Sequence, residues 1–179
     1  MISGLQINPT LVLPSEKYRE SFIEALAEQN DDKLNRLNGD KQAKFDGNFD
    51  SFLASLKDAR EGRNLPEGYV PQTVYWLVEE NKFIGRVSIR HILTDNLLIL
   101  GGHIGYAIRP SERKKGYGSM ALRLALQKAK ELGIEKALVT CSKENIVSRK
   151  IIEKNLGVFE DERIAKDGTI MLRFWIQTN

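Results

Sequence analysis

A basic loop with two glycines, at residues 113–118, is the part of the sequence best suited to chemistry. Glycine lets a backbone approach a ligand closely, and the first N–H groups of a helix, together with its positive dipole end, attract phosphate oxygens. Basic side chains add charge-assisted contacts. The sequence therefore predicts a phosphate site whose members are Arg113, Lys114, Lys115, Gly116, Tyr117, Gly118 and Ser119.

Other phosphate-binding loops use related sequences. A Walker-type loop requires Gly-Lys-Ser/Thr, and the chain contains no such tripeptide. A dinucleotide loop requires Gly-x-Gly-x-x-Gly/Ala, and Gly116, Gly118 and Ala121 fit its looser form. The downstream residues decide between the alternatives, because a buried strand at 136–141 leads into a short helix that opens with Asn-x-x-Ser at 145–148.

The two segments together resemble the GNAT superfamily of N-acetyltransferases. The acyl-CoA pyrophosphate loop of that family is an apolar residue, any residue, Pro, then Arg/Gln-x-x-Gly-x-Gly/Ala, which here is Ile108, Pro110, Arg113, Gly116 and Gly118. Asn-x-x-Ser/Ala, a short helix and a glycine before an apolar strand form the second half of the same signature. Across its whole length the chain is similar to a bacterial group described only as predicted acetyltransferases, which names no acceptor.

The resemblance implies acetyl-CoA as cosubstrate and a backbone site for its pantetheine arm. In the family, the strand before the loop splays from its neighbour and its N–H groups bind the arm and polarise the thioester. These donors would belong to Tyr106, Ala107 and Ile108. Asn145 would bind the pantetheine or act as a simple N-cap, and one residue can do both.

Candidate catalytic residues are His103 and Ser148. Imidazole titrates near neutrality, and His103 begins the strand near the family's usual base, so we expect it to be the general base. Ser148 would contact the cofactor or hold a water; the alternative is a small packing residue. The family's usual acid, a tyrosine seven residues after the motif asparagine, is replaced by Ile152. Cys141, at the end of an apolar strand, is expected to be a core residue rather than a nucleophile.

The elements that must position these residues can be inferred from the apolar periodicity, the caps and the turn residues. Together they predict an α+β, GNAT-like fold with a central mixed sheet of six or seven strands and about four helices, in one domain over residues 1–179. In chain order we expect a strand near 5–12, helices near 15–29 and 50–60, strands near 73–79 and 83–89, a turn at 94–96, a strand at 104–108, a helix ending at 132, a strand at 136–141, a helix from 145 and a hairpin around 166–169.

Composition excludes several classes of function. With 179 residues and 41% hydrophobic content the chain can bury a sizeable core. A net charge of +3 is too small to indicate nucleic acid, and two histidines with one cysteine are poor material for a metal site. No apolar run approaches a membrane span and no signal-peptide pattern begins the chain, so we expect a cytoplasmic protein without membrane association.

These observations predict direct transfer of an acetyl group from acetyl-CoA to a primary amine of a small molecule or peptide. The alternative, motivated by Ile152, is a non-catalytic acyl-CoA-binding or regulatory module. The sequence leaves the acceptor and a homodimeric state open.

Overall fold

Two antiparallel sheets organise the protein. The computed structural model describes residues 9–28, 37–40 and 42–178. The larger sheet has the strand order β1-β4-β5-β6, and the smaller has the order β7-β9-β8. The strands are β1 (Thr10–Val12), β4 (Gln72–Glu79), β5 (Lys82–Arg90), β6 (Ile104–Ile108), β7 (Lys136–Ser142), β8 (Val158–Ile164) and β9 (Ile170–Gln177), with a separate small hairpin of β2 (Gly39–Asp40) and β3 (Ala43–Lys44).

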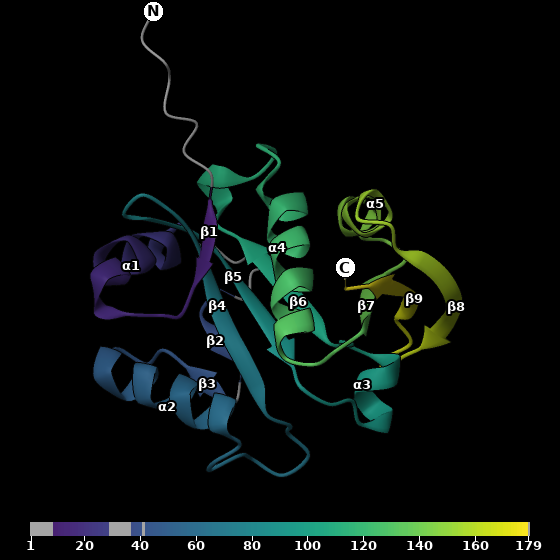
Figure 1. The fold of residues 1–179 in the computed structure, drawn as a ribbon, viewed down its shortest axis with the longest axis horizontal. Helices are drawn as coiled ribbons and strands as arrows, with labels where there is room; N and C mark the ends of the chain where they lie inside the picture. The colour runs from purple at the N-terminus through teal and green to yellow at the C-terminus, as the bar shows by residue number, and fades with distance from the viewer. Residues whose placement is uncertain (1–8, 29–36, 41, 179) are drawn as a thin grey trace, which may run out of the picture.

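Helices cover both faces of the larger sheet (Figure 1). On one face, α1 and α2 pack on an aromatic cluster that includes Phe22, Phe52 and Trp76. On the other face, α4 packs on a core that contains Leu77, Val87 and other apolar residues of both sheets. The helices are η1 (Glu16–Tyr18), α1 (Arg19–Ala27), α2 (Phe49–Glu61), α3 (Asp95–Ile99), η2 (Pro110–Glu112), α4 (Tyr117–Glu131) and α5 (Ile146–Lys154).

The predicted α+β, GNAT-like class is confirmed. The single mixed sheet is corrected, because the seven strands form two sheets and every strand pairing in the described part of the chain is antiparallel. The strands and the main helices lie close to their predicted positions. The Asp167-Gly168 turn joins β8 to β9 as expected, with Gly168 at φ 84.

The segment after β5 differs from the prediction. We expected residues 94–96 to form a turn, but Thr94 caps the short helix α3 by accepting a hydrogen bond from the backbone N–H of Leu97 at 3.3 Å. Threonine before an acidic residue suits a helix N-cap as well as a turn, so these residue types alone do not distinguish the two structures. The predicted strand near 5–12 is described only from residue 10 onward as β1.

Candidate active site

A gap between β6 and β7 separates the two sheets. The two edges are joined just before β6, where the backbone N–H of His103 donates to the carbonyl of Leu138 at 2.7 Å and that of Gly101 donates to Thr140 Oγ1 at 2.9 Å. Beyond these contacts, no strand pairing joins β6 to β7 in the described part of the chain. The strands therefore leave an open edge along β6, which begins after His103.

Two backbone donors of β6 point into this gap. The N–H of Arg109 donates to Ile84 on β5 at 2.9 Å. Because neighbouring residues of an antiparallel strand direct their backbone groups to opposite sides, Ala107 also faces β5, whereas Tyr106 and Ile108 face the gap. The position of the Ala107 carbonyl, 2.4 Å from where a Cβ on Gly85 would lie, agrees with this assignment. Tyr106 and Ile108 thus remain candidate amide donors, and the prediction for Ala107 is corrected because its N–H is directed into the sheet.

The N-terminus of α4 lies at the end of the basic loop and is built for an anion. Its N-cap is Gly116, in the left-handed conformation at φ 91, and no side chain caps the helix in the described part of the chain. Lys114 is also left-handed, at φ 64, a conformation that costs a residue with a side chain ~1–2 kcal/mol. The loop therefore turns the first N–H groups of α4, those of Tyr117, Gly118 and Ser119, toward an open end.

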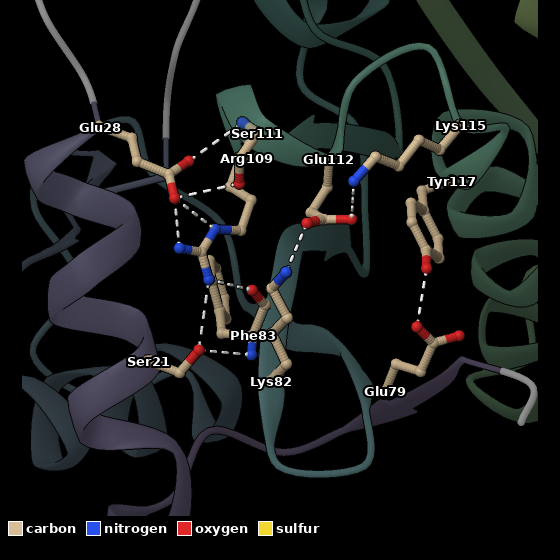
Figure 2. A network of polar contacts seen from close by, with 10 residues as sticks. All are labelled: Ser21, Glu28, Glu79, Lys82, Phe83, Arg109, Ser111, Glu112, Lys115 and Tyr117. Atoms are coloured by element: carbon tan, nitrogen blue, oxygen red, sulfur yellow. Dashed lines mark hydrogen bonds and ion pairs between the residues drawn. The ribbon is translucent and has the colours of Figure 1, made fainter.

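A buried carboxylate lies beneath the loop and takes part of its positive charge. Glu112 is 4% exposed, and its two oxygens accept from Lys82 at 2.5 Å and from Lys115 at 3.0 Å (Figure 2). Burial raises the pKa of Glu112, but the two ammonium groups outweigh this and hold it below its usual value. The ion pair with Glu112 holds Lys115 in place, but its side chain stays 54% exposed, so its contact with phosphate stays a prediction.

Arg113 is exposed and contacts the strand before it. Its Nε donates to the carbonyl of Ile108 at 3.2 Å, which ties the loop back to the last residue of β6. Lys114 is exposed at the surface of the loop. All three basic side chains of the loop are therefore exposed, and their contacts with an anion at the end of α4 stay predictions.

Helix α1 is anchored by Glu28 to the residues just before the basic loop. The carboxylate accepts from Arg109 Nε at 3.0 Å and also from Arg109 Nη2, and it accepts from the N–H and the hydroxyl of Ser111 at 3.1 and 3.0 Å (Figure 2). The hydrogen bond from Arg109 is the main reason that the pKa of Glu28 falls to about 2. Arg109 in turn donates to the carbonyl of Phe83 at 3.0 Å, so one arginine joins α1, β5 and the start of the loop.

Residues at the start of α4 bind neighbouring elements. The Tyr117 hydroxyl donates to Glu79 at 2.8 Å (Figure 2), and the hydroxyl of Ser119 accepts from Asn155 at 3.1 Å. A Cβ on Gly118 would lie 2.8 Å from Ile151 Cδ1, so this glycine allows α4 and α5 to pack closely. A larger residue at position 118 would therefore disturb the packing of α4 on α5, in addition to any effect on a bound anion.

His103 has a structural partner at the base of the gap. The backbone N–H of Leu138 donates to His103 Nδ1 at 2.9 Å. A neutral imidazole that accepts at Nδ1 carries its proton on Nε2, so it has no free lone pair for an ammonium proton. Burial and the nearby Arg90 lower the pKa of His103 to about 4. The geometry therefore gives His103 a role in joining the sheets in place of the predicted role as general base.

Ser148 and Tyr106 meet across the gap. The Tyr106 hydroxyl, from β6, lies 3.0 Å from the Ser148 hydroxyl in the first turn of α5. Asn145 caps α5, since its Oδ1 accepts from the N–H of Ser148 at 2.9 Å. Ile152 is fully buried in the core. The cap that we weighed for Asn145 is present, and the hydroxyl pair lies where β6 and β7 have separated.

A comparison with protein families decides the identity of the fold. A family described as "Acetyltransferase (GNAT) domain" matches residues 18–156, which include the predicted pyrophosphate loop, the Asn-x-x-Ser motif and every site residue described above. The chain belongs to the GNAT acetyltransferase family. A search of curated protein sequences found no match to this chain.

Solved GNAT structures share the fold along nearly the whole chain. The microcin C7 self-immunity acetyltransferase MccE, solved with acetyl-CoA and AMP, has a TM-score of 0.66 at 17% identity and covers 99% of this chain and 97% of its own. A spermidine N-acetyltransferase chimera of Vibrio cholerae SpeG and hSSAT has a TM-score of 0.64 at 14% identity, with 97% and 96% covered. YncA, a putative acetyltransferase from Salmonella typhimurium solved with acetyl-CoA, has a TM-score of 0.59 at 13% identity, with 96% and 94% covered.

Other kinds of site are not evident. Among the described residues, no group of three or more histidine, cysteine, aspartate or glutamate side chains is arranged to hold a metal ion. No helix in the described part of the chain is both long and apolar enough to cross a membrane. The single cysteine, Cys141, is buried, and burial raises its pKa to about 11, as expected for a core residue.

The sequence did not indicate the carboxylates that hold the GNAT loop. Glu28 lies 81 residues before its partner Arg109, and Glu79 lies 38 residues before Tyr117. No local pattern links such residues. Glu112 is close to its partner in sequence, since it lies three residues before Lys115.

Proposed function

We propose that the protein is an acetyl-CoA-dependent N-acetyltransferase that acts on a primary amine of a small molecule or peptide. The observation that carries the proposal is the open N-terminus of α4 beside the free edge of β6. The helix would supply N–H groups for the pyrophosphate, and the unpaired edge of β6 would supply N–H groups for the pantetheine arm. Membership of the GNAT family supports acyl transfer, and the spermidine acetyltransferase and MccE show the fold in proteins named for acetyl transfer.

The residues present fit this cosubstrate. The left-handed Gly116 gives α4 an end without a side-chain cap, and Lys114 adds a positive charge on its surface. The backbone N–H groups of Tyr106 and Ile108 face the gap, where they would donate to the thioester carbonyl. One well-placed donor to a developing oxyanion is worth ~3 kcal/mol.

Transfer is proposed to be direct. The neutral amine attacks the acetyl carbonyl carbon, the C–N bond forms, and the C–S bond breaks with its electron pair on sulfur. His103 is bound to Leu138 and does not accept the ammonium proton. In this proposal the amine loses its proton to water.

A panel of amine acceptors tests the proposal. The protein is incubated with acetyl-CoA and one amine at a time, including spermidine, aminonucleotides and peptides with free N-termini, and release of the CoA thiol is monitored. We expect turnover that saturates with at least one amine and an acetylated product by mass spectrometry. Tight binding of acetyl-CoA without turnover across the panel would favour the acyl-CoA-binding module, and absence of both binding and turnover would refute the proposal.

A further inference from the structure

The Tyr106 and Ser148 hydroxyls form a pair that the fold brings together from separate elements. Tyr106 lies on β6, three residues beyond the junction at His103, and Ser148 lies in the first turn of α5. Their oxygens are 3.0 Å apart, and they are separated by 42 residues in the sequence. Tyr106 is the hydrogen-bond partner of the Ser148 hydroxyl within the described part of the chain.

The direction of the hydrogen bond can be assigned from the chemistry of the two groups. A phenol is a stronger acid than an alcohol, and an alcohol oxygen is the better acceptor, so Tyr106 donates and Ser148 accepts. The position of Ser148 is fixed independently, because its backbone N–H is held by Asn145 at 2.9 Å. With its oxygen occupied by the Tyr106 proton, Ser148 keeps its own O–H to donate elsewhere.

We propose that Ser148 donates this hydrogen bond to the sulfur of the departing CoA thiolate and that Tyr106 is the positioning residue that aims it. The inference rests on the proposed function, since it assumes that the thioester lies in the gap between β6 and β7. It assigns a partner for the leaving group where Ile152 offers none.

The pair stabilises the thiolate without giving up a proton. Burial raises the pKa of Tyr106 to about 12, and a thiol has a pKa of ~8.5, so the thiolate is too weak a base to take the phenolic proton. The C–S electron pair leaves with sulfur, and the thiolate acquires its proton from water, which has received the proton lost by the amine. A hydrogen bond to an ionised group is stronger than one between neutral groups, so the effect is larger as the C–S bond breaks than in the bound thioester.

A double-mutant cycle tests the inference with the best acceptor from the amine panel. Ser148→Ala is expected to lower kcat ~10–100-fold, the equivalent of one hydrogen bond to a charged group, and Tyr106→Phe ~10-fold. The two variants should bind acetyl-CoA within ~3-fold of wild type, because the interaction strengthens only as charge develops. In the Ser148→Ala background, Tyr106→Phe should cost less than ~2-fold, because Tyr106 acts through Ser148.

Tyr75→Phe is the matched control. Tyr75 also packs partly buried against the core under α4, so the variant removes a hydroxyl from the same environment without touching Ser148, and its kcat should equal that of wild type. An equal loss for Tyr106→Phe in both backgrounds, or no loss in either, would overturn the inference. Wild-type protein that turns over no amine would instead refute the proposed function, so the two failures are distinguishable.

Discussion

Replacing Glu28 with glutamine is expected to destabilise the protein, because its carboxylate balances a buried arginine. Arg109 is 4% exposed, and Glu28 accepts two hydrogen bonds from it and two from Ser111. Breaking a buried ion pair costs ~3–5 kcal/mol. Because the Glu28 side chain keeps 26% of its exposure and a glutamine oxygen can still accept, we expect the free energy of unfolding to fall by ~2 kcal/mol at pH 7.

The same variant should change the response to acid. The hydrogen bond from Arg109 lowers the pKa of Glu28 from 4.5 to about 2 in the folded protein. A carboxylate with a depressed folded pKa contributes stability that is present above its unfolded pKa and is lost as pH falls through the folded value. The difference in stability between wild type and Glu28→Gln should therefore be constant above about pH 5 and shrink as pH falls from 4.5 toward 2.

Urea denaturation monitored by tryptophan fluorescence measures the difference in unfolding free energy between wild type and Glu28→Gln at pH 7, 5 and 3. Glu16→Gln is the matched control, because Glu16 is 59% exposed and pairs with Arg19 at 3.0 Å. Exposed pairs contribute little, so we expect a loss below ~0.5 kcal/mol. If Glu28→Gln were no more destabilising than Glu16→Gln, or if its effect were independent of pH, the link between α1 and the loop would not have the strength argued above.

Two further predictions concern His103 and Gly157. His103→Ala should lower the free energy of unfolding by ~1–3 kcal/mol, because it leaves the Leu138 N–H without its acceptor. The pH profile of kcat/KM should not change. If the variant lost the acidic limb of that profile, His103 would be the general base after all. Gly157→Ala would place a Cβ 2.4 Å from Ile152 Cγ2 and 2.9 Å from Ile152 O, so we expect a loss of ~1–3 kcal/mol by thermal or urea unfolding, and an unchanged stability would contradict the close packing of α5 on the chain leading to β8.

Stability should also depend on His103 through its own titration. Its pKa is lowered from 6.5 to about 4 in the folded protein, so unfolding takes up a proton in this range. Stability from this group is present above about pH 6.5 and is lost as pH falls toward 4, and the His103→Ala variant should lack that dependence.

The loop and its helix were predictable because their determinants are local. Pro110 ends the strand, the glycines at 116 and 118 permit the turn, and the apolar stripe of α4 begins at once. The strands of the sheets could be read from alternation for the same reason. Short elements were less predictable: α3 covers only five residues, too few for a helical period to show.

The side-chain partners were not predictable because tertiary structure sets them. His103 has the residue type of a base, but its role depends on the backbone N–H of Leu138, 35 residues further on. Tyr106 was predicted as a backbone donor, and only the fold brings α5 and Ser148 to its hydroxyl. Likewise, the basic residues of the loop could be counted from the sequence. The ion pair between Lys115 and Glu112 could not, because it depends on how the chain turns between the two residues.

Binding of acetyl-CoA to two charge-reversal variants tests the central claim, that the N-terminus of α4 holds the pyrophosphate. Lys114→Glu reverses one positive charge on the loop that precedes α4. Lys130→Glu is the control, because it reverses one positive charge in the last turn of this 15-residue helix. The helix is about 22 Å long, well beyond the ~8 Å screening length at physiological salt. Calorimetric titration should show an affinity ~10–100-fold weaker for Lys114→Glu and unchanged for Lys130→Glu. Equal affinities for the two variants, in folded protein, would contradict the account.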